Sequence, residues 1–151
     1  MIYEQAFAKV AEPEVVQTGF IGCGAFSTPM LTQAQIVPRM NVSIVADVDV
    51  EAGKLAYRRA GIADHDIVVC DSRADALAAM ERGRKVVVQD AAILMDLPLE
   101  VIVTATRVPE AAARYGSMAI GHGKHLVMID KETESVIGPI LKHRADREGV
   151  V

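Results

Sequence analysis

Two glycines and one acidic residue have the types and spacing of a phosphate-binding turn with a ribose-binding partner. Gly22 and Gly24 directly follow an apolar run that ends at Ile21, and a predicted helix follows them. Such a turn lets the amides of the helix start point at a pyrophosphate, which the helix dipole also favours. Asp47 closes the next apolar run, 20 residues after Ser27, where a carboxylate accepts hydrogen bonds from ribose hydroxyls. The pattern therefore predicts dinucleotide binding.

Each residue of this motif also has a simpler interpretation. Turns need glycine for their own geometry, and Asp47 could only cap the helix that follows it. The third position of such a turn usually holds Gly or Ala, so that the helix lies close to the strand; Ser27 is small but departs from that pattern. At the helix start, Cys23 has either a lowered thiol pKa or the role of a small side chain packed against the second helix. The combination of strand, turn, helix, strand and acid favours a dinucleotide site.

Asp47 also indicates which dinucleotide is preferred. A carboxylate at this position repels a phosphate on the ribose 2′-oxygen. The residues that follow it, Val48–Glu51, carry no positive charge. We therefore expect NAD or NADP as the cofactor, with NAD favoured.

An alternation of apolar runs and helices must position this motif. Runs of Val and Ile that are buried on both faces, with a helix after each, indicate parallel strands joined by right-handed crossovers. The predicted strands are Glu14–Ile21, Asn41–Asp47, Asp66–Cys70, Leu99–Ala105 and His125–Ile129, with Lys85–Gln89 as one more short strand. The predicted helices are Phe26–Val37, Glu51–Ala60, Ala74–Arg82, Pro109–Ile120 and Ser135–Glu148. The expected fold class is α/β, a doubly wound and mostly parallel sheet of the Rossmann type.

The length of 151 residues allows one domain, so we expect residues 1–151 to form a single dinucleotide-binding domain. Residues 1–13 are predicted to form an N-terminal arm or helix, with the helical pattern over Ile2–Ala11. Ala91–Leu97 is predicted to be irregular or a short helix. Gly149–Val151 resembles the opening of a further strand, so a catalytic or substrate domain is expected after residue 151.

The composition excludes several classes of partner. With 16 Lys and Arg against 20 Asp and Glu, the chain has a formal charge of −4 and lacks the basic surface that nucleic acid requires. It also has three Tyr, three Phe and no Trp, and hence few platforms for stacking bases. The longest uncharged stretch, Val15–Pro38, contains glycine, proline and glutamine and would insert poorly into a bilayer. We expect no nucleic acid partner and no membrane segment.

The remaining polar residues indicate a reduced compartment and no metal. Glu4, Lys9 and Glu12 interrupt the start of the chain, which therefore lacks the apolar core of a signal peptide. Cys23 and Cys70 lie far apart, without metal-like spacing, so a cytoplasmic location is expected. The four histidines are dispersed, and no metal site is expected.

Four segments occur in the order seen in homoserine-dehydrogenase-like oxidoreductases. They are Gly19–Ser27, Val45–Asp49, Val101–Thr106 followed by Pro109 and Glu110, and Gly121–Met128. The chain most resembles the branch whose members carry a C-terminal SAF domain, which includes enzymes similar to deoxyxylulose-phosphate reductoisomerase. The resemblance runs from about Val15 to the end of the chain. It covers only the nucleotide-binding part of such an enzyme.

This resemblance implies roles for individual residues. It implies that the pyrophosphate turn is formed by Gly22, Cys23, Gly24, Ala25 and Phe26, with Asp47 on the ribose. It also implies that Thr104, Ala105, Thr106 and Arg107 run beside the nicotinamide ribose. Relatives often have Gly in place of Arg107, which leaves the path of this loop open; the arginine could instead reach a phosphate. Lys131 is implied as the catalytic residue that orients a carbonyl or stabilises oxyanion charge. The alternative is that Lys131 lies in a solvated turn before the last helix.

Three functions are compatible with these features. The favoured one is an NAD(P)-dependent oxidoreductase, in which hydride passes between nicotinamide and a small-molecule carbonyl or alcohol held by a second domain. The alternatives are a non-catalytic NAD(H)-binding module or redox sensor, and a methyltransferase with Asp47 on the ribose of S-adenosylmethionine. The pyrophosphate-sized turn favours the first two. We expect the isolated chain to be inactive, and to form a homo-oligomer through its exposed sheet edge.

Overall fold

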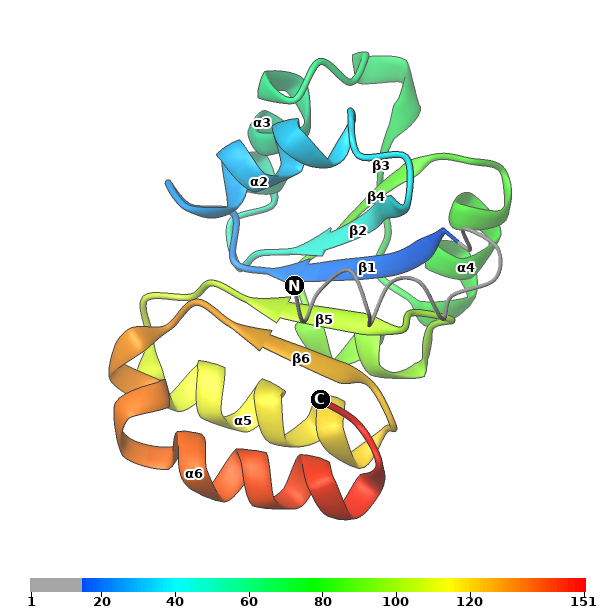
Figure 1. Ribbon diagram of the computed structural model, residues 1–151. Helices are drawn as coiled ribbons and strands as arrows, with labels where there is room; N and C mark the ends of the chain where they lie inside the picture. Colours follow the sequence, from blue (N-terminus) through cyan, green and yellow to red (C-terminus); the bar gives the residue numbers. More distant parts are fainter. Residues whose placement is uncertain (1–14) are drawn as a thin grey trace.

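Six parallel strands form one sheet in the computed structural model, which describes residues 15–151 (Figure 1). The strands are Val16–Ile21 (β1), Met40–Ala46 (β2), Ile67–Val69 (β3), Lys85–Val88 (β4), Val101–Thr104 (β5) and His125–Met128 (β6). Their order across the sheet is β3-β4-β2-β1-β5-β6, and every neighbouring pair is parallel. The predicted α/β class and Rossmann-type sheet are confirmed. The predicted Ile2–Ala11 helix and the residue Glu14 lie outside the described residues.

Helices cover both faces of this sheet (Figure 1). They are Ser27–Ala34 (α2), Val50–Arg59 (α3), Arg73–Glu81 (α4), Pro109–Gly121 (α5) and Lys131–Glu148 (α6), with 3₁₀ turns at Asp64–Asp66 and Ala91–Asp96. Leu31 of α2 and Tyr57 of α3 pack against Phe20 of β1. Ala76 of α4 and Ala119 of α5 belong to the core on the opposite face. The doubly wound arrangement follows from these two cores. None of the helices in residues 15–151 is both long and apolar enough to cross a bilayer.

The strand Lys85–Val88, expected only as one more short strand, lies inside the sheet. It pairs with β2 on one side and with β3 on the other. Its three valines are fully buried and alternate between the two cores, as an apolar run buried on both faces requires. The expectation that a full helix follows each strand is wrong here. The predicted short piece over Ala91–Leu97 is a 3₁₀ helix, and its Leu94 and Met95 are buried in the core.

Two helix boundaries differ from those predicted by more than one residue. Helix α2 ends at Ala34 rather than Val37, because Gln35 and Ile36 donate to carbonyls three residues back and tighten the last turn. Helix α6 begins at Lys131, four residues before Ser135. The Ser135 hydroxyl donates to the Lys131 carbonyl at 2.7 Å within the helix instead of capping it. The interpretation of Lys131 as part of a turn is therefore wrong, since this residue is helical.

The end of the chain lies beside β6. Gly149 ends α6 in the left-handed conformation, with φ of 71°. The Leu126 amide then donates to the Val151 carbonyl at 2.7 Å. The predicted opening of a further strand thus corresponds to contact between Val151 and the outer edge of β6.

Candidate functional site

The glycine turn lies at the carboxyl end of β1, where the order of strands in the sheet reverses. The chain runs from β1 to β2 on one side and later returns to β5 on the other. The Gly22 amide donates to the Ala46 carbonyl at 2.8 Å, and the Ala105 amide donates to the Ile21 carbonyl at 2.8 Å. These bonds fix the turn between the ends of β2 and β5. In open α/β sheets, ligands bind in the crevice at this switch point.

The two glycines of the turn are required for different reasons. Gly22 has a φ of 95°, and a Cβ there would lie 2.5 Å from the carbonyl oxygen of Ala105. The chain itself therefore requires glycine at this position. A Cβ at Gly24 would meet no heavy atom within 4 Å. Glycine at that position leaves open space beside the helix start.

Three amides of the turn have no acceptor in the part of the chain that the structure describes. Within residues 15–151, the backbone N–H groups of Gly24, Ala25 and Phe26 have no hydrogen-bond partner. The bond from the Thr28 amide to the Gly24 carbonyl, at 3.2 Å, begins the helical turn after them. Free amides at a helix start form an anion-binding site. The turn thus has the unpaired amides that a pyrophosphate site requires, and the binding itself stays a prediction.

Ser27 has a function in the turn beyond its small size. It is fully buried, and its hydroxyl donates to the Gly22 carbonyl at 2.5 Å. This bond closes the turn between the strand end and α2. The departure from Gly or Ala at the third position therefore adds a hydrogen bond through one extra hydroxyl group.

Replacing Ser27 with alanine is expected to lower the free energy of unfolding by about 1 kcal/mol, because the half-buried Gly22 carbonyl loses its donor. The midpoint of urea unfolding at constant slope measures this change. Thr28→Ala is the matched control, since the Thr28 hydroxyl bonds to the Gly24 carbonyl at an exposed position. Equal midpoints for the wild type and Ser27→Ala would contradict the role assigned to this hydroxyl.

Asp47 is turned towards the glycine turn rather than towards α3. One carboxylate oxygen accepts from the Cys23 amide at 2.7 Å, and the other accepts from the Asp49 amide at 2.9 Å. The N-cap of α3 is Asp49, whose side chain accepts from the Glu51 amide. The alternative interpretation of Asp47 as a helix cap is therefore wrong. The carboxylate keeps further lone pairs for hydroxyl donors.

Cys23 is a core residue of the turn. It packs in the cluster that contains Tyr57 of α3. Burial, and then the charge of Asp47, raise the pKa of the Cys23 thiol to about 12. The thiol is protonated at neutral pH, so the interpretation as a small packed side chain holds and the reactive thiol is excluded.

Two cavities meet at the glycine turn. The first, of about 400 Å³, is lined by Asp47, Val48, Asp49, Gln89 and Tyr115, and is called the β2 cavity. The second, of about 640 Å³, is lined by Phe26, Ile129, Asp130, Lys131 and Thr133, and is called the β6 cavity. Both cavities are lined by Gly24, Ala105, Thr106 and Arg107. A continuous surface thus runs from Asp47, past the free amides, to the start of α6.

The loop after β5 forms the junction between the cavities. The Val108 amide donates to the Thr106 hydroxyl at 3.2 Å, which folds the loop back on itself. The exposed Arg107 lines both cavities beside the glycine turn. The buried Thr104 hydroxyl lies beside the Asp130 carboxyl. Of the four residues predicted from this loop, Ala105, Thr106 and Arg107 therefore line the crevice, whereas Thr104 is fully buried at the end of β5 and lines neither cavity.

Asp130 is a site residue that the sequence reasoning missed. It is only 6% exposed and lines the β6 cavity. Burial raises the pKa of its carboxyl, and the hydroxyls of Thr104 and Thr106 oppose the shift. Lys131, nominated instead, is the exposed first residue of α6 and lines the same cavity. The signal that could have found Asp130 is the one used for Asp47, an acid that ends an apolar strand.

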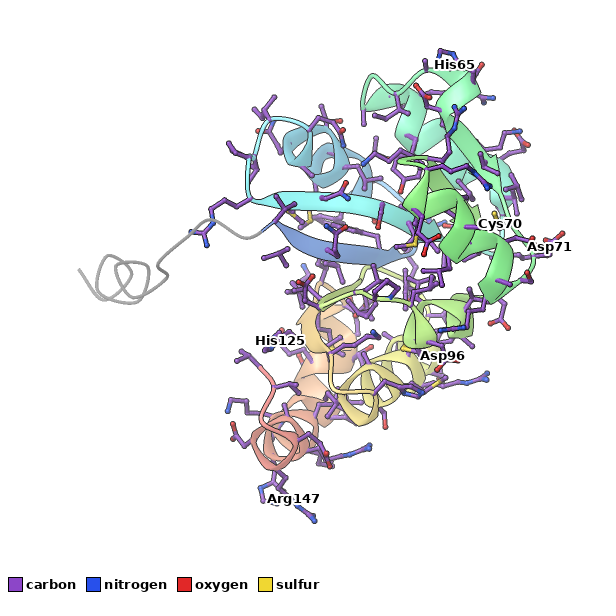
Figure 2. The ribbon with its side chains drawn as sticks, turned by 90° about the vertical axis from the view of Figure 1, so that its right-hand side faces the viewer. His65, Cys70, Asp71, Asp96, His125 and Arg147 are labelled. Carbon is purple, nitrogen blue, oxygen red and sulfur yellow. The ribbon has the colours of Figure 1, made fainter. Side chains whose placement is uncertain are left out.

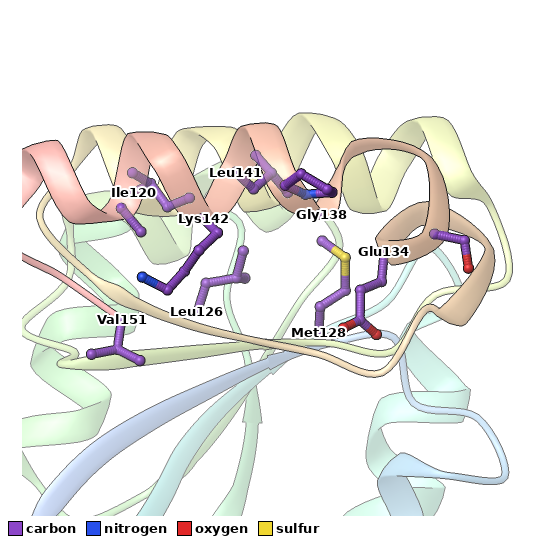
Figure 3. A pocket seen from close by; sticks show the side chains of 11 residues that line it. Ile120, Leu126, Met128, Glu134, Gly138, Leu141, Lys142 and Val151 are labelled. Carbon is purple, nitrogen blue, oxygen red and sulfur yellow. The ribbon is translucent and has the colours of Figure 1, made fainter.

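A third cavity lies away from this crevice, between β6 and α6 (Figure 3). Its volume is about 750 Å³, and Leu126, Met128 and Leu141 line it together with Glu134 and Lys142. None of the predicted site residues lines it. Within residues 15–151, no group of three or more His, Cys, Asp or Glu is placed to hold a metal. Figure 2 shows His65 and His125 in separate parts of the molecule.

Comparison with known proteins shows which solved structures have a similar fold. Neither the models of protein families nor the curated protein sequences contain a match. Among solved structures, an oxidoreductase from Agrobacterium radiobacter in complex with NAD+, L-tartaric acid and magnesium is similar, with a TM-score of 0.66 and 17% identity over 89% of this chain. GenD2 from gentamicin A biosynthesis, in complex with NAD, has a TM-score of 0.63 and 16% identity over 91% of this chain. The 3-ketoreductase KijD10 from Actinomadura kijaniata, with NADP and TDP-benzene, has a TM-score of 0.60 and 16% identity over 91%.

These likenesses concern the fold. This chain covers 33%, 33% and 36% of the lengths of those three structures, which is about a third of each. The matched part is a parallel α/β sheet of the Rossmann type. The activities of those proteins belong to chains about three times as long.

Proposed function

We propose that this chain binds NAD or NADP as the nucleotide-binding domain, residues 1–151, of an oxidoreductase. The observation that carries the proposal is the continuous surface of the two cavities, with free amides at their junction. A dinucleotide has the same three-part form: a pyrophosphate at the Gly24 amides, an adenosine in the β2 cavity with its ribose on Asp47, and a nicotinamide riboside in the β6 cavity. Arg107 adds a cation beside the pyrophosphate. Solved structures of the same fold carry NAD or NADP.

Two finer parts of the proposal rest on the sequence resemblance. They are membership of the homoserine-dehydrogenase-like group with a SAF domain, and hydride transfer to or from a small carbonyl or alcohol. A cytoplasmic location is proposed from the scarcity of cysteine. Both cysteines are free and buried, which fits a reduced compartment. Lys131 is proposed to orient the carbonyl from the rim of the β6 cavity. The groups that fix the substrate about 3–3.5 Å from nicotinamide would come from a second domain, so the isolated chain would bind nucleotide without turnover.

Titration of the purified chain tests the proposal. Calorimetry with NADH, NADPH, ADP-ribose and S-adenosylmethionine separates the candidate functions. We expect saturable binding of the first three ligands, since each contains a pyrophosphate, and no binding of S-adenosylmethionine. Binding of S-adenosylmethionine alone would replace the proposal with the methyltransferase. Binding of NADH by a natural full-length protein that transfers no hydride would favour a redox sensor.

The preference for NAD is proposed to come from Asp47. Replacing Asp47 with serine and Val48 with arginine removes a repulsion and adds a phosphate partner. We expect the NADPH-to-NADH affinity ratio to rise at least about tenfold, equivalent to about 1.4 kcal/mol. The ratio is the correct readout, because loss of the Cys23 amide bond to Asp47 weakens both ligands. A wild type that already binds NADPH more tightly would contradict this electrostatic role.

A further inference from the structure

Two large apolar side chains of α6 lie in solvent, away from the side of the helix that packs against α5 and β6. Val136 is 77% exposed and Ile140 is 62% exposed, and the two lie one turn apart. Pro139 is exposed beside Ile140. Figure 1 shows α6 at the outside of the molecule, next to α5. Single exposed apolar side chains are ordinary, whereas adjacent ones on one surface indicate contact with a partner.

The charged residues on this side of α6 are separated along the helix. Glu132 lies one turn before Val136, whereas Arg147 lies near the end of the helix, and Figure 2 shows its side chain turned away from the rest of the molecule. Between described residues, neither Glu132 nor Arg147 forms an ion pair within 4 Å. Spacings of three and four residues place six exposed residues on one side of the helix, here called the α6 stripe: Glu132, Val136, Pro139, Ile140, His143 and Arg147. The stripe is thus acidic at one end, apolar in the middle and basic at the other end.

The order of residues along the α6 stripe is complementary to itself. The stripe is symmetric about the point between Pro139 and Ile140, so a two-fold axis at this point lays two copies of α6 antiparallel. The two apolar centres then lie against each other, and Glu132 of each copy faces the partner's Arg147. A parallel alignment would instead place each charge against the same charge of the partner, which is unfavourable. The charge pattern therefore favours a second copy of this chain, in the antiparallel direction.

We propose that the α6 stripe is the contact between two copies of this chain, paired antiparallel about a two-fold axis. One helix from each copy buries less than the roughly 1,600 Å² of a standard interface, so the dimer is weak and reversible. Glu132 also lines the β6 cavity, so the dimer places the partner's Arg147 at the rim of that cavity. The inference does not depend on nucleotide binding.

Sedimentation equilibrium of the purified chain, from about 1 μM to about 1 mM, tests the contact. The average mass is expected to rise with concentration from that of one chain towards that of two. Ile140→Ser is expected to weaken association at least about tenfold, because it removes the apolar centre from both copies. Ile36→Ser is the matched control, since Ile36 is 73% exposed after the end of α2. This control is expected to associate as the wild type does.

Reversal of the end charges tests the antiparallel direction. Glu132→Arg and Arg147→Glu each replace two attractions across the axis with two repulsions. Each single variant is therefore expected to weaken association about tenfold or more. The double variant restores both pairs with the charges exchanged, and its association is expected to return to within about threefold of the wild type. This recovery distinguishes a lost contact from a lost fold.

Three outcomes overturn the inference. The first is a wild-type chain that remains monomeric at every concentration. The second is a dimer that Ile140→Ser leaves unchanged, because such a dimer forms through another surface, such as the outer edge of β6. The third is a double charge variant that associates no better than the two single variants.

Discussion

The Gly24→Val variant is expected to fold normally and to lose dinucleotide binding, with an affinity for NADH reduced by at least about a hundredfold. A branched side chain at this position enters the open space beside the free amides, where the pyrophosphate is proposed to lie. The chain leaves room for the substitution, because a Cβ at this position has no neighbour within 4 Å. Calorimetric titration with NADH measures the loss, and urea unfolding confirms the fold. An unchanged affinity for NADH in a folded variant would show that the nucleotide does not bind at this turn.

The Gly22→Ala variant, unlike Gly24→Val, is expected to lose stability: its free energy of unfolding falls by about 3–4 kcal/mol. Part of this loss comes from a φ of 95°, and the rest from a Cβ placed 2.5 Å from the Ala105 carbonyl oxygen. That oxygen belongs to the backbone and cannot rotate away. Urea unfolding of the variant against wild type measures the difference.

Gly61→Ala is the matched control for this second experiment. Gly61 also has a positive φ, of 86°, but a Cβ there would meet nothing within 4 Å. Its substitution is expected to cost only the backbone strain, about 1–2 kcal/mol. Equal losses for the two variants would show that the approach of Ala105 to Gly22 adds nothing.

The sequence predicts the elements of this fold better than their arrangement. Runs such as Val86–Val88 identify strands buried on both faces, and Gly22 and Asp47 lie where the pattern places them. The order of the strands could not be predicted, because an apolar run carries no signal for its neighbour. Lys85–Val88 therefore resembles an additional strand in the sequence, while in the sheet it lies between β2 and β3.

The candidate site was predictable where the function of a residue depends on local chain geometry. The glycine turn is local, and the structure has the turn at the residues where the pattern places it, between β1 and α2. The direction of the Asp130 side chain depends on Thr104 and Thr106, about 25 residues earlier, and local rules assign such an aspartate to capping. The same rules place the start of α6 at Ser135, whose hydroxyl bonds within the helix instead.

The position of β4 between β2 and β3 has a consequence for how the chain folds. Within the described residues, β3 pairs only with β4, so it is joined to the rest of the sheet only through a strand that is synthesised later. This side of the sheet therefore cannot be completed before β4 has been synthesised. The segment from β1 to β2, by contrast, closes through contacts between residues such as Cys23 and Asp47, only 24 positions apart. Closing a loop costs conformational entropy, and this cost is smaller when the contacting residues are close in sequence. The glycine turn and Asp47 can therefore come together early in folding, before the outer strands assemble.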